Sequence, residues 1–441
     1  MTATTGAGHV PHVPNVPDAP HVLDDLLWRG LVAESTDLGE LRAAMDARPV
    51  TFYCGFDPSA PSLHLGSLVQ ILTMRRLQEA GHFPIALVGG ATGLIGDPKP
   101  TAERVLNDPA IVANWVDRIA TQLRPFLSFE GPNAALMANN LDWTAPLSAI
   151  SLLRDIGQHF RVNRMLAKEA VSARLGSAAG ISYTEFSYQI LQALDFLELY
   201  RRHGCVLQTG GSDQWGNLTA GLDLIHRVEG VSVHALATPL VTKADGAKFG
   251  KTESGTLWLD PALTSPYAFY QFWVNADDRD VSVYLRLFSL LPRPQIEALE
   301  EATAVRPAAR QAQRALAAEL TTLVHGAKAA GAALQASLAL FGQGQLDALD
   351  EPTLSAALRE TPTGQAEPGS SCAELFAATG LVPSRAAARR AVAEGGAYLN
   401  NVRLADPGAV LAAEDFLHGR WAVLRRGKRS VAGVEWVQGR P

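Results

Sequence analysis

Short apolar runs alternate with helical patterns over the first half of the chain, from Val50 to about Arg227. The runs VTFYCGF (50–56), FPIALVGG (83–90) and CVLQTGG (205–211) predict strands, because each is short, apolar and bounded by glycine or polar residues. A helical stretch follows each of them. Such alternation is typical of an α/β domain with a parallel sheet. Ligands bind such sheets at the carboxyl ends of the strands, where the glycine-rich segments of this chain fall.

The second half of the chain changes character twice. From about Ser265 to Phe341 it is rich in alanine and predicts helices. Residues 344–371 are polar and contain glycine and proline, so we expect a linker with one short helix. Residues 372–441 have an apolar pattern of their own and end in strand-like runs such as RWAVLRRG, which predicts a separate small domain. Residues 1–20 are rich in proline and predict a disordered arm.

Composition excludes several classes of protein. A chain of 441 residues with 47% hydrophobic and 19% charged residues has material for more than one packed domain. The net charge of −6 gives no overall signal for nucleic acid, so any RNA contact must come from a local patch. The three cysteines are far apart, which argues against a disulfide framework or structural zinc and fits a reducing, cytoplasmic compartment. No secretory signal or membrane-spanning run is predicted, and no metal site.

The segment DPSAPSLHLGSLVQILTMRRLQEAG (57–81) passes from loop chemistry into an amphipathic helix. It places His64 and Gly66 at the predicted helix start. A helix start presents unpaired N–H groups and a partial positive charge, so anions bind there. A phosphate-bearing ligand is one interpretation, and a plain loop histidine is the other.

A second candidate is VTKADGAKFGKTESGTLWLD, in which Lys248 and Lys251 flank a glycine and Thr252 follows. Two lysines on such a loop can neutralise phosphate oxygens. The ending Gly250-Lys251-Thr252 resembles a P-loop, but Gly246 lies one residue too close and the next residues predict turn and strand rather than helix. An exposed lysine hairpin without a ligand is the alternative.

Two further segments carry polar residues in apolar surroundings. In YTEFSYQILQALDFLELY, Tyr188, Gln192 and Asp195 lie on one stripe of a helix that is otherwise apolar, so a buried polar ligand competes with simple exposure to water. In LQTGGSDQWGN, Gly211 permits close approach and Asp213 can accept hydrogen bonds from two ribose hydroxyls, unless it only caps the next helix. GGATGLIGDP does not match the dinucleotide fingerprint.

The C-terminal segment is basic although the chain is acidic overall. The charges form two groups, and either a polyanion site or a hydrated basic face explains them. The predicted RNA-binding residues are Arg385, Arg389 and Arg390 on one helix, and Arg425, Arg426 and Lys428 in a turn.

Together these segments resemble a known family. HLGS resembles the HIGH signature of class I aminoacyl-tRNA synthetases, and KFGKT resembles their KMSKS loop. The segments YCGFDPSAPSLHLGS, ALVGGATGLIGDP, TEFSYQILQALDF and GGSDQWGN are similar to those of bacterial tyrosyl-tRNA synthetases, and the C-terminal segment resembles their S4-type domain. The resemblance runs from about His21 to the end.

The resemblance implies an α/β fold: a Rossmann-like parallel-sheet catalytic domain over 21–247, then a KMSKS-like loop and α-helical tRNA-binding domain over 248–343. A small α+β S4-like RNA-binding domain over 372–441 completes it. It also implies the reaction, in which tyrosine and ATP with Mg²⁺ give tyrosyl-adenylate and pyrophosphate, and the tyrosyl group then moves to tRNA(Tyr). ATP is a substrate, no tightly bound cofactor is expected, and the family is homodimeric.

Matching motifs also imply residue roles. Residues expected to stabilise the departing pyrophosphate are His64, Lys99, Arg104, Lys248, Lys251 and Thr252. Residues expected to contact ATP are Cys54, Gly55, Asp57, Gly66, Ser67, Gly211, Asp213 and Lys251. Residues expected to bind tyrosine are Tyr53 and Asp195 at the phenol, Tyr188, Gln192 and Asp97 at the ammonium group, and Gln214 at the carboxylate. Ser67 replaces the second histidine of HIGH, so weaker contact with ATP is expected.

Two rivals remain at this point. Tryptophanyl-tRNA synthetases share the fold, although Asp195 opposite Tyr53 favours a phenol and the S4-like tail favours tyrosine. A non-catalytic RNA-binding protein could also retain a synthetase fold, although Lys248 and Lys251 argue against it.

Overall fold

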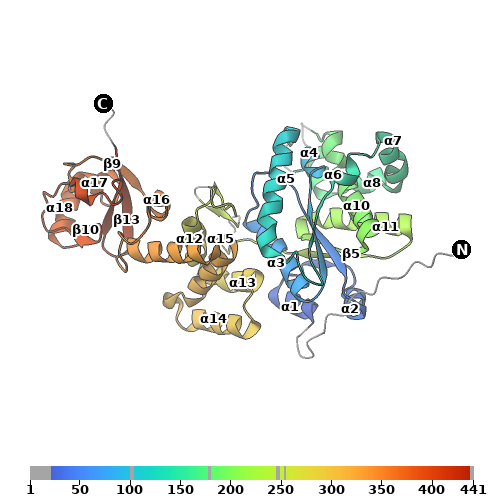
Figure 1. Ribbon diagram of the computed structural model, residues 1–441, viewed down its shortest axis with the longest axis horizontal. Coiled ribbons are helices and arrows are strands. Elements are labelled where there is room, and N and C mark those ends of the chain that lie inside the picture. The colour runs from blue at the N-terminus through green and yellow to red at the C-terminus, as the bar shows by residue number, and fades with distance from the viewer. Residues whose placement is uncertain (1–20, 100–103, 177–179, 245–248, 253–254, 438–441) are drawn as a thin grey trace. The chain divides into compact units, whose positions relative to one another are not determined.

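The computed structural model describes residues 21–99, 104–176, 180–244, 249–252 and 255–437 (Figure 1). The described chain divides into two compact units. The first comprises the residues up to Asp260 together with 286–288, and the second comprises 261–285 together with the residues from Ser289 onward.

A six-stranded sheet forms the centre of the first unit, in the order β1-β6-β5-β2-β3-β4. Its strands are β1 (Glu34–Ser35), β2 (Thr51–Phe56), β3 (Phe83–Val88), β4 (Leu136–Asn139), β5 (Cys205–Gly211) and β6 (His234–Thr238). All neighbours are parallel except β1, which is antiparallel to β6. The three predicted strands and the α/β fold are therefore confirmed.

The order of the strands fixes where a ligand can bind. From β2 the chain proceeds to β3 and β4 on one side, and it later returns to place β5 on the other side of β2. The connections diverge at this switch point, which leaves a crevice beyond the carboxyl ends of β2 and β5.

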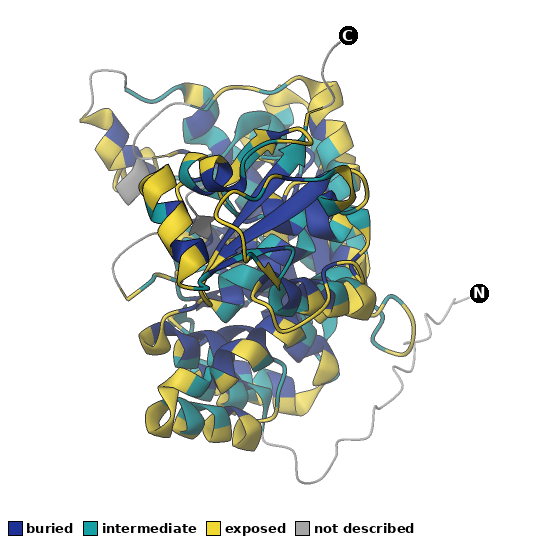
Figure 2. Ribbon diagram, turned by 90° about the vertical axis from the view of Figure 1, so that its left-hand side faces the viewer, coloured by how far each residue is buried: buried dark blue, intermediate teal, exposed yellow. Residues whose placement is uncertain are grey.

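Helices cover the sheet, whose strands are largely buried, while the helices carry both buried and exposed turns (Figure 2). The longer helices are α1 (Val22–Arg29), α2 (Leu38–Ala47), α3 (Leu65–Glu79), α5 (Pro109–Leu123), α10 (Tyr183–His203) and α11 (Trp215–Glu229). The shorter ones are α4 (Thr92–Ile95), α6 (Leu141–Thr144), α7 (Ala149–Ser151), α8 (Val162–Leu166) and α9 (Glu169–Leu175).

The predicted helix with the polar stripe is α10. Ser182 caps its first turn by accepting a hydrogen bond from the amide of Glu185, and Gly204 ends it with a positive φ of 61°. Phe196 and Leu197 on this helix are fully buried in the core of the first unit. The polar stripe is therefore carried by a helix that packing holds in place.

A small hairpin, β7 (Lys251–Thr252) with β8 (Gly255–Thr256), carries the end of the KFGKT segment. Among the described residues of this segment no helix begins, which agrees with the rejection of a P-loop. The amide of Leu65 donates to the carbonyl of Leu257 at 3.2 Å, so this segment packs beside the start of α3. The expected boundary at 247 is therefore wrong, because these backbone contacts join residues up to Asp260 to the first unit.

The second unit begins with helices, as the alanine-rich composition predicts. They are α12 (Pro266–Val274), α13 (Asp278–Phe288), α14 (Arg293–Val305) and α15 (Gln311–Leu340). Gly326 interrupts α15, because its φ of 85° is a conformation that glycine adopts without strain.

The C-terminal part contains a five-stranded sheet in the order β11-β10-β12-β13-β9. Its strands are β9 (Thr363–Ala366), β10 (Ala397–Leu399), β11 (Val402–Arg403), β12 (Trp421–Arg426) and β13 (Ser430–Trp436). The accompanying helices are α16 (Glu351–Arg359), α17 (Cys372–Ala378) and α18 (Arg385–Ala393).

The segment 344–371 contains the predicted short helix, α16, but it is packed into the C-terminal part and is not a linker. Within it, α16 buries Leu354 and Leu358 completely, and β9 pairs in parallel with β13. The indole N–H of Trp421 also donates to the hydroxyl of Ser355 at 2.8 Å. The sequence analysis missed β9, because the partner of this short edge strand lies far along the chain.

None of the helices in the described ranges is long and apolar enough to cross a membrane.

Candidate active site

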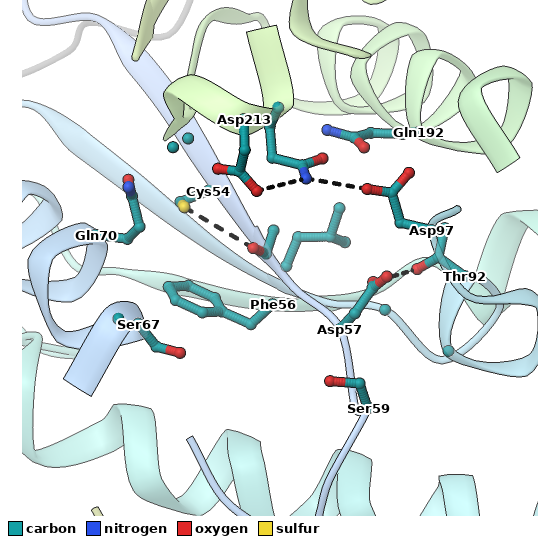
Figure 3. A pocket seen from close by; sticks show the side chains of 18 of the residues that line it. Cys54, Phe56, Asp57, Ser59, Ser67, Gln70, Thr92, Asp97, Gln192 and Asp213 are labelled. Atoms are coloured by element: carbon teal, nitrogen blue, oxygen red, sulfur yellow. Dashed lines mark hydrogen bonds between the residues drawn. The ribbon is translucent and has the colours of Figure 1, made fainter. Parts of the chain in front are cut away.

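A cavity of about 740 Å³ lies in the first unit, at the carboxyl ends of β2 and β5 (Figure 3). Sixteen of the predicted site residues line it: Tyr53, Cys54, Gly55, Asp57, His64, Gly66, Ser67, Asp97, Lys99, Arg104, Tyr188, Gln192, Asp195, Gly211, Asp213 and Gln214. Lys248 and the side chains of Lys251 and Thr252 lie outside the described residues. Segments far apart in the sequence thus meet in one space, as the motifs predicted. We call its buried end, around Asp195, the floor, and its exposed end, around His64, Lys99 and Arg104, the mouth.

His64 is the N-cap of α3, which confirms the predicted helix start. Its Nδ1 accepts a hydrogen bond of 3.0 Å from the amide of Gly66, so Nδ1 carries no proton and Nε2 is left as the donor. A side chain on Gly66 would lie 2.8 Å from the imidazole, which explains the glycine. Surrounding protein atoms remove water from His64 and lower its pKa, so the ring is neutral near pH 7.

Asp195 forms the floor of the cavity. Its carboxyl group accepts hydrogen bonds from the indole of Trp143 at 2.9 Å and from the amide of Asn140 at 3.0 Å. The residue is only 2% exposed, and burial raises the pKa of Asp195 to about 8. The pKa of Tyr53 is raised as well, chiefly by its burial, so its phenol stays protonated. A neutral, hydrogen-bonding floor of this kind suits a ligand with a polar tip on an apolar body.

Four buried polar atoms of the lining have no hydrogen-bond partner among the described residues. They are the hydroxyl of Tyr53 and the side-chain oxygens of Gln70, Gln192 and Gln208. A buried polar group left without a partner costs about 1–3 kcal/mol, so four in one cavity indicate a polar ligand. Gln208, on β5, was not predicted from the sequence.

Tyr188 and Asp57 are bonded to each other at the side of the cavity. The hydroxyl of Tyr188 donates to Asp57 at 2.5 Å, and Thr92 donates to the other carboxylate oxygen at 2.6 Å. Burial raises the pKa of Asp57. Because the proton of Tyr188 is engaged, only its oxygen lone pairs are available, and these suit a donor such as an ammonium group.

Asp97 lies in a polar network with α11 and its preceding turn. It accepts from Gln214 at 3.0 Å and from Asn217 at 3.3 Å, and the ammonium group of Lys168 lies 3.5 Å away. Gln214 also donates to Asp213 at 3.1 Å. Gln214 was predicted at the carboxylate of the amino acid, whereas its amide N–H groups bond to two aspartates here. Lys168 and Asn217 were missed by the sequence analysis.

Lys99 and Arg104 supply positive charge at the mouth. Lys99 is exposed, and the positive charge of Arg104 is the main cause that lowers its pKa. Arg104 is anchored through its Nε, which donates to the carbonyl of Asp97 at 2.8 Å. Two cations that repel each other in this way favour an anion between them.

Burial limits what Cys54 can do. Its thiol pKa is raised to about 12, so it stays neutral and can contact a ribose only as a weak hydrogen-bond donor. Figure 3 shows Asp97, Gln192 and Asp213 grouped on one side of the cavity and Ser67 and Gln70 on the other. Gln70 was not predicted, although it lies one helical turn after Ser67 on the same helix.

Asn140 and Trp143 are the main omissions of the sequence analysis. The segment NLDW (140–143) follows β4 directly, and a polar residue at the carboxyl end of a parallel strand is a signal that could have identified Asn140. Trp143 carried no comparable signal.

The basic C-terminal residues divide into two sets. Arg385, Arg389, Arg390, Arg426 and Lys428 are exposed. Arg425 is buried instead, because its guanidinium lies 3.9 Å from the ring centre of its cross-strand neighbour Tyr398 and donates to Asn401 at 3.0 Å. The prediction of Arg425 as an RNA contact is therefore wrong.

Comparison with known proteins identifies the family of the chain. Residues 45–342 match the family described as tRNA synthetases class I (W and Y), and residues 354–432 match the tyrosine–tRNA ligase SYY-like C-terminal domain. The second match begins within α16, in agreement with the correction to the predicted linker.

Close relatives share nearly the whole chain. The tyrosine–tRNA ligase of Streptomyces avermitilis is 67% identical over 419 residues, which cover 95% of this chain and 99% of the relative. That of Mycobacterium bovis is 57% identical over 420 residues, covering 94% and 99%.

Among solved structures, a C-terminally truncated mitochondrial tyrosyl-tRNA synthetase of Coccidioides posadasii is similar. It matches with a TM-score of 0.63 and 32% identity over 72% of this chain and 92% of that one. The chain therefore belongs to the class I tRNA synthetases for tryptophan and tyrosine, within the group of bacterial tyrosine–tRNA ligases.

Proposed function

We propose that the protein joins tyrosine to tRNA(Tyr) in two steps, first activating tyrosine with Mg·ATP and then transferring it to the 3′ end of the tRNA. The observation that supports this most strongly is the cavity. It combines a buried floor with unpaired polar atoms and a mouth with a neutral histidine and two cations.

At the floor, Tyr53 and Asp195 would bond the phenolic hydroxyl of tyrosine, with Asp195 aimed by Asn140 and Trp143. Phenylalanine has no hydroxyl, so it would leave Tyr53 and Asp195 without a hydrogen-bond partner. The free-energy cost of these unsatisfied groups opposes its binding. Tryptophan would place an indole N–H elsewhere in the pocket. Asp97, Tyr188 and Gln192 would receive the ammonium group through their acceptor oxygens.

No strong base is needed for activation, because the carboxylate of tyrosine is already the nucleophile. It attacks the α-phosphorus of ATP, the bond to the bridging oxygen breaks, and pyrophosphate leaves with its Mg²⁺. Catalysis then comes from alignment and from neutralising charge that develops on the leaving group. The Nε2–H of His64 and the cations Lys99, Arg104, Lys248 and Lys251 would supply that neutralisation.

Transfer requires the protein to hold tRNA. The exposed arginines of α18, together with Arg426 and Lys428, offer positive charge for its phosphates. We expect a truncation after Gln343 to retain tyrosine activation and to lose charging of tRNA(Tyr). Equal loss of both activities would contradict this division. A truncation after Gly369 is less suitable, because it separates β9 from its partner β13.

We also infer a homodimer that works in the cytoplasm. Large apolar side chains that are exposed in the first unit gather between residues 136 and 183. They include Leu141, Ile150, Leu153, Val162, Leu166, Leu175 and Tyr183. Such a concentration favours association with a second copy.

Amino-acid-dependent exchange of radioactive pyrophosphate into ATP tests the proposed activity. Tyrosine should support exchange, whereas phenylalanine and tryptophan should not. Exchange with tryptophan would indicate the other specificity of the family, and exchange with none of the three would indicate an RNA-binding protein without catalysis.

A further inference from the structure

Two buried charged residues lie just behind the cavity, and neither lines it. Arg174 on α9 is 2% exposed, and Glu185 in the first turn of α10 is 1% exposed. Their side chains form an ion pair, with Nη1 of Arg174 at 3.1 Å from Oε2 of Glu185. Because burying two charges is expensive, such a pair needs a reason beyond filling space.

Both members of this pair also bond to the backbone that carries the cations of the mouth. Nη1 of Arg174 donates to the carbonyl of Lys99 at 3.2 Å, and Nε donates to the carbonyl of Gly180 at 2.9 Å. The amide of Arg104 donates to Oε1 of Glu185 at 2.8 Å. The ion pair thus holds the chain at Lys99 on one side and at Arg104 on the other.

The position of Glu185 in the helix extends this connection to the floor. The same helix carries Tyr188, Gln192 and Asp195, which line the cavity one to three turns further on. Packing fixes that helix, since Phe196 and Leu197 are fully buried. The ion pair therefore connects the backbone of Lys99 and Arg104 to α10, the helix that lines the floor of the cavity.

We propose that Arg174 and Glu185 are positioning residues for tyrosine activation: they set where Lys99 and Arg104 meet the pyrophosphate that leaves ATP. This inference rests on the proposed function and adds residues that do not touch the substrates. A misplacement of about 1 Å at a catalytic group can lower a rate about 10²-fold, so the backbone anchor matters even though the cations themselves are unchanged.

The variant Glu185→Gln tests the proposal, because it keeps the volume and removes the charge that pairs with Arg174. We expect kcat for tyrosine-dependent pyrophosphate exchange to fall at least tenfold, and the KM for pyrophosphate in the reverse reaction to rise at least tenfold. The dissociation constant for tyrosine, measured by equilibrium dialysis without ATP, should stay within twofold. Arg201→Gln, which removes an ion pair with Glu229 at the other end of α10, is the matched control and should change none of these.

A second measurement asks whether Glu185 acts through the two cations. In a protein that already carries Lys99→Ala and Arg104→Ala, adding Glu185→Gln should change exchange less than twofold. A full additional loss in that background would overturn the proposal, as would equal losses of tyrosine affinity and pyrophosphate handling.

Misfolding is addressed by a second variant. If Glu185→Gln no longer binds tyrosine, Glu185→Asp takes its place, since it keeps the charge and shortens the reach to Arg104. We again expect the KM for pyrophosphate to rise while the dissociation constant for tyrosine stays the same. An unchanged KM for pyrophosphate in a folded variant would overturn the proposal. Wild-type protein without tyrosine-dependent exchange would overturn the proposed function, and the positioning with it. If the wild-type protein is active and the variant has the same exchange rate and KM for pyrophosphate, only the positioning role of Arg174 and Glu185 is overturned.

Discussion

At the floor of the cavity the polar side chains are buried and the carboxyl group of Asp195 is held by hydrogen bonds, whereas at the mouth His64 and Lys99 are exposed. Asp195 is held by Asn140 and Trp143, while His64 and Lys99 face the opening. Side chains that are locked before a ligand arrives lose little entropy on binding, so the floor is suited to selection. Exposed cations are hydrated until a polyanion replaces the water, and they then neutralise its charge directly. The mouth is therefore suited to stabilising the charge that develops in a transition state.

Removing the carboxyl group of the floor should have the largest effect. In Asp195→Ala, tyrosine loses a partner for its phenol, and the donors on Asn140 and Trp143 lose theirs. We expect the affinity for tyrosine to fall about 10²-fold or more, at about 1–3 kcal/mol for each unpaired group. Equilibrium dialysis measures this, and the exposed neighbour Asp142→Ala is the control. Unchanged tyrosine affinity would remove the floor from the recognition of the phenol.

Removing the hydrogen-bond donor of His64 at the mouth should lower the rate of tyrosine activation and leave tyrosine binding unchanged. We expect His64→Ala to lower kcat for pyrophosphate exchange about 10²-fold, as loss of one transition-state donor commonly does, with tyrosine affinity unchanged. His64→Asn separates two roles of the residue, because asparagine still caps α3 but places its donor elsewhere. If His64→Asn were as active as wild type, the histidine would matter only as a cap.

Removing the unpaired hydroxyl of the floor should separate selectivity from stability. Tyr53→Phe deletes a buried hydroxyl that has no partner among the described residues, so the unliganded protein should unfold at the same temperature or higher. Discrimination between tyrosine and phenylalanine, taken from kcat/KM in exchange, should fall about tenfold, or about 1.4 kcal/mol. A lower unfolding temperature would mean that the hydroxyl has a structural partner.

The last prediction concerns how the stability of the folded protein depends on pH. The pKa of Asp195 is about 8 in the folded protein, above its ordinary value of 3.8, so folding favours the protonated group. Its stabilising contribution is complete below about pH 4, declines by up to about 1.4 kcal/mol per pH unit as pH rises towards 8, and changes no further above that. Asp195→Asn lacks this decline, so the difference between wild-type and variant unfolding free energies should shift across this range. Parallel curves would show that Asp195 is ionised in the folded protein.

Local patterns predicted much of this molecule. The strands β2, β3 and β5 and the stripe on α10 follow from periodicities that a single segment displays, and His64 with Gly66 marks the start of α3. Partners that lie far apart in the sequence were harder to predict. Asn140 and Trp143 reach Asp195 only because β4 lies beside β3, and β9 is ordered by β13. Arg425 lies in a basic run of the sequence that predicts an exposed cation, but its cross-strand neighbour Tyr398 covers it.

The pairing of β9 with β13 sets an order of events during synthesis on the ribosome. Thr363 pairs with Gly433, so the edge of the C-terminal sheet cannot close until Gly433 has been made. Every residue that lines the cavity precedes Asp260 and emerges earlier. Since domains fold as units from the N-terminal side, the half with the cavity can fold while the S4-like sheet still lacks its last strand. A stalled or truncated chain would then combine a folded cavity with an open sheet edge, which is a template for aggregation.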